Sequence, residues 1–179
     1  ALGLYFKLFY VPSPLTLFKN ILKLKPAHYI IYKDNKISIN RYWDIEDSSA
    51  EYSEQEAIDG IRHLMRDSVK RQLISDRPVG VFLSGGIDST SVLGNASEFS
   101  PGIKTYSVGF SDKIGNEKFD SKFNRDFYLA RKTSKLYGTD HHELMINGAD
   151  ILANFEKTVW HMDEPNPNAT HVPTYLLAK

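Results

Sequence analysis

The sequence predicts an α/β protein built on a doubly wound parallel sheet, and three observations support this prediction. From residue 54 onward, amphipathic helical patterns alternate with short β-branched and aromatic runs. This alternation is typical of parallel strands that are joined by right-handed helical crossovers. A glycine turn at 85–86 separates one such run from the helical pattern that follows it. With 179 residues, 41% of them hydrophobic, the chain is long enough for one domain or one and a half.

The first part of the chain is expected to lie outside this sheet. Residues 1–9 are mostly apolar and precede the sequence V-P-S-P, which ends any helix there. Residues 28–33 and 36–43 predict two strands, and the short turn between them makes an antiparallel hairpin. The polar, acidic stretch 44–54 is typical of a linker.

The remaining elements follow in order. The capping box S-E-Q-E at 53–56 precedes a helix predicted over 54–74. Strands are predicted at 79–84, 103–110 and 139–146. Helices are predicted after the glycine turn, at 125–137 where Gly138 ends the helix, after Asn147 as the cap, and from 174 to 179. A surface loop is predicted at 111–124.

Composition narrows the classes of partner. Lys plus Arg and Asp plus Glu both number 22, so no net field favours nucleic acid or an anionic membrane. The chain contains no cysteine, which excludes disulfides, thiolate metal sites and a cysteine nucleophile within it. No apolar run approaches the roughly 20 residues of a membrane helix. We therefore expect a cytoplasmic protein that acts on small molecules.

The turn at 84–89 is predicted to bind an anion. A strand, a tight glycine turn and a helix start aim several backbone N–H groups at one point, where the helix dipole adds positive charge. Glycine there allows close approach of a phosphate and tolerates positive φ. The loop is not of the Walker type, because no lysine follows its glycines. The alternative is an ordinary turn in which Asp88 or Ser89 caps the helix.

The sequence S-G-G-I-D-S at 84–89 resembles the pyrophosphate loop of the ATP pyrophosphatases, which cleave ATP to AMP and pyrophosphate while activating a carboxylate or carbonyl. Flanking segments resemble the glutamine-dependent asparagine synthetases. Those similar to the end of the glutaminase domain and the interdomain link are 10–18, 21–28 and 41–44; those similar to the synthetase domain are S-V-G-F at 107–110, L-Y-G-T-D-H-H-E at 136–143 and D-E-P at 163–165. Two departures are Ala27, where the family usually has glycine, and Asp126-Phe127, where an acidic pair is usual.

The resemblance implies two regions: residues 1–50 as the end of a glutaminase-like domain with the link, and 51–179 as the first part of an ATP-pyrophosphatase domain. The family's N-terminal cysteine and its second motif, S-G-E-G-x-D-E, are absent. We therefore expect an interior fragment that is inactive alone.

For the intact protein, the resemblance implies a ligase that activates the aspartate side chain as acyl-AMP, releases pyrophosphate and forms asparagine with glutamine-derived ammonia. The cofactors would be ATP and Mg²⁺, and a homodimer is compatible with the sequence. Two alternatives stay open: a related amidotransferase acting on a sugar acid or a peptide, and a degenerate nucleotide-binding protein. The acceptor acid is not identified by these residues.

Roles follow for the residues of the loop. The pyrophosphate would be held by the backbone and hydroxyl donors of Ser84, Gly85, Gly86 and Ser89. Asp88 would bind Mg²⁺, because a hard cation takes carboxylate oxygen. Ser84 and Asp88 are thus the candidate catalytic residues, with a helix cap as the alternative role for Asp88.

The adenine would lie against other residues. Leu83 and Val108, at the carboxyl ends of adjacent strands, would line it, although ordinary core residues look the same in sequence. His141 and His142 are neighbours in a strand and face opposite ways, so a shared metal is disfavoured and a buried histidine beneath the nucleotide is expected. Asp163 and Glu164 would face the substrate amine or organise ammonia, or form a solvated helix end.

Overall fold

The computed structural model describes residues 1–45, 51–111, 124–162 and 164–179. The chain divides into two compact units, one made of 1–51 with 156–171 and the other of 52–155 with 172–179. The division falls inside helix α6, Gly148–Trp160, so the last turn of this helix belongs with the N-terminal segment. The predicted surface loop lies outside the described residues, apart from its ends.

The first unit contains helix α1 (Leu2–Leu8) and a hairpin of β1 (His28–Lys33) and β2 (Lys36–Arg41). The strands are antiparallel and form their own two-stranded sheet, which confirms the predicted hairpin. Asp34 and Asn35 have φ of 52° and 56°, as a two-residue type I′ turn requires. The second strand ends at Arg41, two residues earlier than predicted.

The backbone at Ala27 has a conformation that favours glycine. Ala27 precedes β1 with φ of 58°, in the left-handed region where a side chain costs about 1–2 kcal/mol. Glycine adopts this conformation without that cost. The usual family glycine therefore matches the backbone that this position requires.

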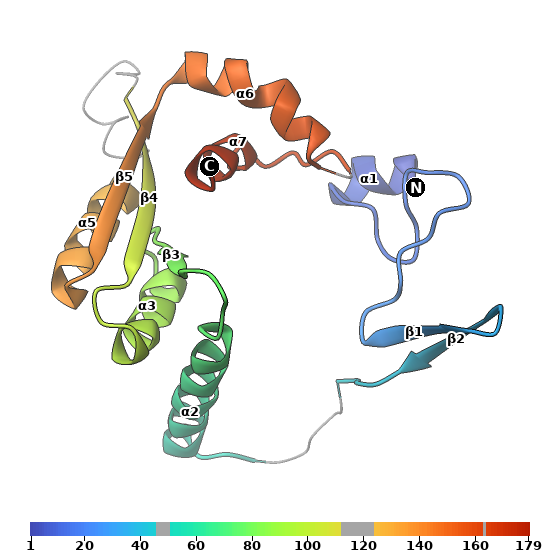
Figure 1. The fold of residues 1–179 in the computed structure, drawn as a ribbon, viewed down its shortest axis with the longest axis horizontal. Coiled ribbons are helices and arrows are strands. Elements are labelled where there is room, and N and C mark those ends of the chain that lie inside the picture. Colours follow the sequence, from blue (N-terminus) through green and yellow to red (C-terminus); the bar gives the residue numbers. More distant parts are fainter. Residues whose placement is uncertain (46–50, 112–123, 163) are drawn as a thin grey trace. The chain divides into compact units, whose positions relative to one another are not determined.

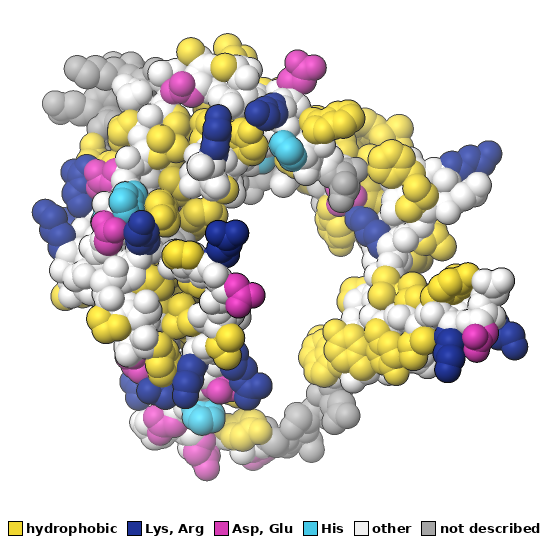
Figure 2. Space-filling view, in the orientation of Figure 1, with side chains coloured by type: hydrophobic (Ala, Val, Ile, Leu, Met, Phe, Trp, Pro, Cys, Tyr) yellow, Lys and Arg dark blue, Asp and Glu magenta, His cyan; other side chains and the backbone are white. Residues whose placement is uncertain are grey.

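One face of the hairpin is apolar. The cross-strand pairs Ile30↔Ile39 and Tyr32↔Ile37 lie on the same face, because alternate residues of a strand point the same way. Their side chains are all largely exposed, and Figure 2 shows hydrophobic side chains gathered on this element.

The second unit contains the parallel sheet. Its elements are α2 (Glu54–Gln72), β3 (Gly80–Phe82), α3 (Ile87–Phe99), β4 (Lys104–Phe110), α5 (Arg125–Tyr137), β5 (Asp140–Ile146) and the segment of α7 (His171–Leu177) from residue 172. The strands run parallel in the order β3-β4-β5 (Figure 1), which confirms the α/β class. The element bounds differ from the predicted ones mostly by one to three residues.

Short-range hydrogen bonds set where these helices begin and end. Ser53 Oγ accepts from the Glu56 N–H at 3.3 Å, and the Glu56 carboxylate accepts from the Ser53 N–H at 2.9 Å, which confirms the capping box of α2. These hydrogen bonds from Ser53 also lower the pKa of Glu56. Asn147 and Asp150 exchange a similar pair of bonds at the start of α6. Gly138 ends α5 with φ of 61°, as predicted.

The hydrophobic core of this unit lies on one face of the sheet. Its buried members come from α2, α3, α5 and the residues next to β3 and β4: Val69, Leu83, Leu93, Ala96, Ile103 and Ala130. These helices therefore pack together on that face. On the other face, the neighbours Phe82, Tyr106 and His142 form a row across the three strands. Phe82 is 50% exposed, so this second face is only partly covered.

Candidate functional site

The loop between β3 and α3 is closed by its own serines. The Ser84 N–H donates to Ser89 Oγ at 3.3 Å, and the two hydroxyl oxygens lie 3.0 Å apart. Ser89 Oγ donates to the Gly86 carbonyl at 3.2 Å, and the Gly86 N–H donates to Ser84 Oγ at 3.4 Å. The structure thus brings Ser84, Gly86 and Ser89 together at the carboxyl end of β3, as predicted from their spacing.

Gly85 is the residue on which the loop turns. Its φ is +77°, and a Cβ built there would lie 2.6 Å from the Ala130 nitrogen and 2.8 Å from the Asp126 carbonyl. The loop therefore packs directly on the first turns of α5. Glycine is required twice, by the backbone conformation and by this approach.

Asp88 does not cap helix α3, in which it is the second residue. The N-cap of α3 is Gly86, and no side chain among the described residues caps this end. The interpretation of Asp88 or Ser89 as the N-cap is therefore wrong. Asp88 lies in the first turn, exposed, where the helix dipole favours negative charge and the first N–H groups lack helical partners.

Leu83 and Val108 lie on opposite faces of the sheet. The Leu83 side chain is 2% exposed and belongs to the core beside α3, and its N–H donates to the Tyr106 carbonyl at 2.8 Å. The Leu83 side chain is therefore part of the core and does not form an exposed apolar surface, contrary to the prediction. Val108 points to the other, partly open face of β4.

The two histidines of the H-H-E sequence face opposite ways, as predicted. His141 is 10% exposed, with its ring nitrogens 2.8 Å from Thr105 Oγ1 and 3.2 Å from Ser107 Oγ. His142 stacks on the Tyr106 ring, with 5.2 Å between ring centroids. His141 pairs with Thr105, which in turn pairs with Val81 of β3. His141 therefore lies nearer the amino ends of the strands than the loop 84–89 does.

An ion pair sits beside His141. Arg131 Nε and Nη2 donate to the two Glu143 oxygens at 2.6 and 2.7 Å. This bidentate hydrogen bond lowers the pKa of Glu143 below its ordinary 4.5. Burial lowers the pKa of His141 below its ordinary 6.5, and the positive charges of Arg131 and His142 lower it further. The negative charge of Glu143 raises it, but by less than burial lowers it. His141 is therefore neutral at pH 7.

The lowered pKa of His141 predicts a pH dependence of stability. The unfolded chain takes up a proton near pH 6.5 more readily than the folded one, so stability is full above that pH and falls as the pH drops below it. We expect the thermal midpoint of the 179-residue chain to decrease from pH 7.5 to 5.5. His141→Gln should flatten this dependence, whereas the control His142→Gln should keep it. An equal slope in the His141 variant, measured by circular dichroism, would contradict the assignment.

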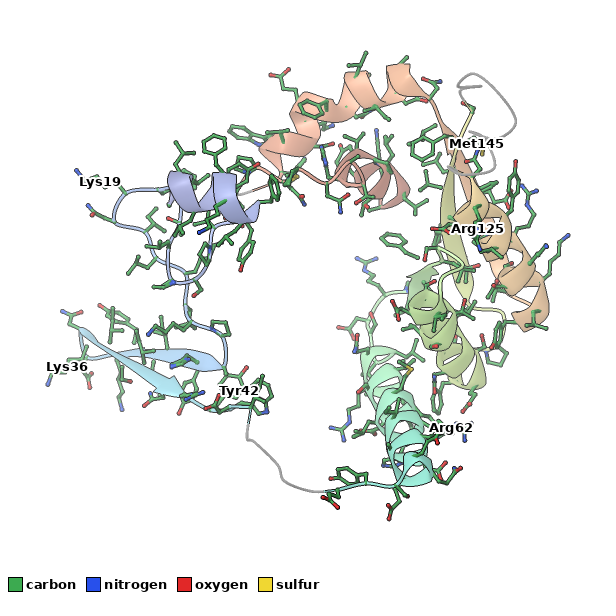
Figure 3. The ribbon with its side chains drawn as sticks, turned by 180° about the vertical axis from the view of Figure 1, so that it is seen from behind. Lys19, Lys36, Tyr42, Arg62, Arg125 and Met145 are labelled. Carbon is green, nitrogen blue, oxygen red and sulfur yellow. The ribbon has the colours of Figure 1, made fainter. Side chains whose placement is uncertain are left out.

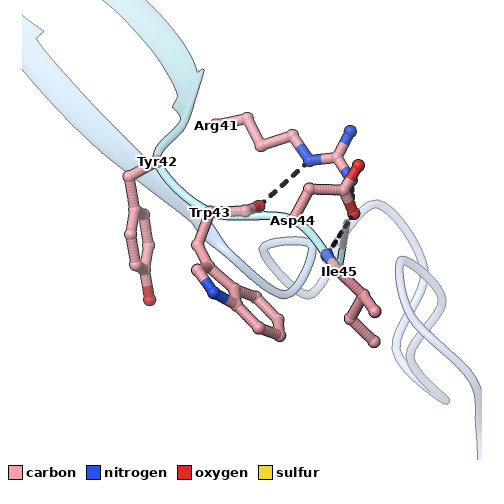
Figure 4. A pocket seen from close by; sticks show the side chains of 5 residues that line it. All are labelled: Arg41, Tyr42, Trp43, Asp44 and Ile45. Carbon is pink, nitrogen blue, oxygen red and sulfur yellow. Dashed lines mark hydrogen bonds and ion pairs between the residues drawn. The ribbon is translucent and has the colours of Figure 1, made fainter. Parts of the chain in front are cut away.

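A separate surface hollow lies at the end of the hairpin. It has about 670 Å³ and is lined by five consecutive residues, Arg41 to Ile45 (Figure 4). Arg41 pairs with Asp44 and donates from Nε to the Trp43 carbonyl at 3.1 Å. All five residues are exposed, so this is an open surface feature.

Several residues that shape the site were not anticipated. Thr105 and Ser107 hold His141, and their alternation with apolar residues in β4 was the available signal. The buried Asn124 accepts from the Phe110 N–H at 2.8 Å and donates to its carbonyl at 2.9 Å, which ties the end of β4 to the start of α5. Figure 3 labels Arg125 at that start and Met145 near the end of β5. Nothing in the local sequence indicated the pairing of Asn124 with Phe110.

In the described part of the chain, no three His, Cys, Asp or Glu side chains gather in a way that could hold a metal ion. Likewise, no helix there has the length and apolar character to cross a membrane.

A parallel sheet whose strands are joined by helices, with a serine and glycine turn at the carboxyl end of β3, defines an α/β protein. The asparagine synthase family profile matches residues 60–179. The chain belongs to the asparagine synthase family.

Relatives match the chain beyond that region. Asparagine synthetase [glutamine-hydrolyzing] 1 of Bacillus subtilis (strain 168) is 32% identical over all of this chain and 27% of its own length. Putative asparagine synthetase [glutamine-hydrolyzing] 2 of Methanocaldococcus jannaschii is 33% identical, over all of this chain and 34% of its own. Amidase chyE of Penicillium rubens is 32% identical over 92% of this chain and 26% of its own length. The chain thus spans about a third or less of these relatives.

Proposed function

We propose that this chain is part of an ATP-dependent ligase that activates the side-chain carboxylate of aspartate as acyl-AMP, releases pyrophosphate, and forms asparagine with ammonia drawn from glutamine. The observation that supports this most is the loop 84–89 at the carboxyl end of β3, in a chain of the asparagine synthase family. Because the chain spans only part of its relatives, the proposal concerns the protein that contains it.

The loop residues suit a polyphosphate. The uncapped N–H groups of α3 and the hydroxyls of Ser84 and Ser89 are donors for phosphate oxygens, and Gly86 leaves room for close approach. Oxygen donors fit Mg²⁺, and the exposed Asp88 carboxylate is the one charged group of the loop. Bound there, Mg²⁺ would neutralise charge on the leaving pyrophosphate. The backbone of Leu83 and the face of Val108 would lie against the adenine.

The candidate functions differ in the acid that accepts the amide nitrogen. The relatives named asparagine synthetase favour aspartate. A fungal protein of similar identity carries a different name, amidase, so the second candidate, a related amidotransferase acting on a sugar acid or a peptide, stays open. A degenerate nucleotide-binding protein is the third.

Pyrophosphate release separates these candidates. We expect the full-length protein with ATP and Mg²⁺ to release pyrophosphate when aspartate is added, and to form asparagine when glutamine or ammonium is also present. Release with a sugar acid or a peptide in place of aspartate would instead support the second candidate. If ATP binds and no acid triggers release, the protein is a nucleotide binder and the ligase proposal is wrong.

A further inference from the structure

The N-terminal segment holds a glutamate of the loop that follows α6. Lys23 Nζ lies 2.9 Å from Glu164 Oε2 and donates to the Val11 carbonyl at 2.9 Å. The two charged residues are 141 positions apart in sequence and belong to the same compact unit. Glu164 is therefore ion-paired rather than a wholly solvated helix end, and its side chain is 29% exposed. Asp163 lies outside the described residues.

Lys23 is held by its surroundings. Its own N–H donates to the Pro14 carbonyl at 2.9 Å, and the Val11 carbonyl belongs to a residue that is 1% exposed. Between them, Thr16 Oγ1 donates to the Ile21 carbonyl at 2.7 Å. Figure 3 labels Lys19 on this loop. Hydrogen bonds from the Lys23 N–H to Pro14 and from Nζ to Val11 thus fix the position of the ammonium. Less side-chain entropy is then lost when Lys23 pairs with Glu164.

Glu164 stands at the start of an organised loop. The Asn168 N–H donates to Asn166 Oδ1 at 2.9 Å, and the Thr170 N–H donates to Asn168 Oδ1 at 3.1 Å. These local turns continue to the first residue of α7. An anchor at Glu164 therefore bears on the placement of the whole segment 164–170.

The ion pair joins two different parts of the family pattern. Glu164 lies within the stretch matched by the asparagine synthase family, 60–179, and Lys23 lies before it. Relatives that cover the whole chain are named glutamine-hydrolysing. We propose that Lys23 is a positioning residue: through Glu164 it couples the segment preceding the synthase region to the loop after α6, and thereby supports the use of glutamine as nitrogen donor. This rests on the proposed function.

Comparing nitrogen donors tests the coupling in the full-length protein. Free ammonium needs no contribution from the segment before the synthase region, so Lys23→Met and Glu164→Gln should each lower the ratio of glutamine-dependent to ammonium-dependent amide formation by about 5-fold or more. The double variant should lower it no further, because the two residues act as one pair. Lys23→Arg should retain most of the ratio. Lys25→Met, which removes a nearby exposed lysine, is the matched control and should leave it unchanged.

A second measurement does not depend on activity. In the 179-residue chain, Lys23→Met should speed hydrogen exchange at the Asn168 and Thr170 amides, and Lys25→Met should not. Unchanged exchange, or an equal loss with both nitrogen donors, would overturn the positioning role. If the wild-type protein forms no amide with either donor, the proposed function fails, and the exchange result alone decides whether Lys23 positions the loop.

Discussion

Asp88→Asn is expected to reduce aspartate-dependent pyrophosphate release in the full-length protein by about 100-fold or more, the cost of losing one preorganised charge-stabilising group. Asparagine keeps the shape of the side chain and lacks the charge that a magnesium-bridged pyrophosphate needs. The thermal midpoint should change little, because Gly86 and not Asp88 is the N-cap of α3. Initial rates of pyrophosphate release, with the midpoint measured beside them, give the test.

Glu98→Gln is the matched control, since it removes a carboxylate from the other end of the same helix, where Glu98 pairs with Arg66. It should release pyrophosphate at a nearly normal rate. An Asp88→Asn protein as active as this control would leave the loop as a phosphate-binding turn and refute the metal role of Asp88.

Gly85→Ala is expected to destabilise the sheet unit strongly. An alanine at φ of +77° costs about 1–2 kcal/mol. Its Cβ would also meet backbone atoms of α5 at 2.6 Å, and forced overpacking adds about 1–3 kcal/mol. We expect the thermal midpoint of the 179-residue chain to fall by at least about 4 °C.

The neighbouring glycine provides the comparison. Gly86 has φ of −72°, and a Cβ there would lie 3.5 Å from Ser84 Oγ, an ordinary contact. Gly86→Ala should therefore change the unfolding free energy by no more than about 0.5–1 kcal/mol. Similar midpoints for the two variants in a thermal melt would show that α5 does not press on the loop as described.

The sequence by itself determined the features that depend on residues close together in the chain. The capping box at Ser53, the type I′ turn at Asp34 and Asn35, and the Gly138 helix end each involve contacts within a few residues, so their spacing predicts them. The loop at 84–89 is also continuous in sequence. The parallel α/β class followed from the alternation of the elements.

Only the tertiary structure decided which distant residues complete the site. The approach of α5 to Gly85, the seat of His141 between Thr105 and Ser107, and the pairing of Lys23 with Glu164 join residues that no local pattern relates. Backbone geometry also ruled out Asp88 as the cap of α3, because Gly86 is the residue at which the chain leaves the helical conformation. Contacts of this kind depend on how the elements pack, and packing arises from the whole chain.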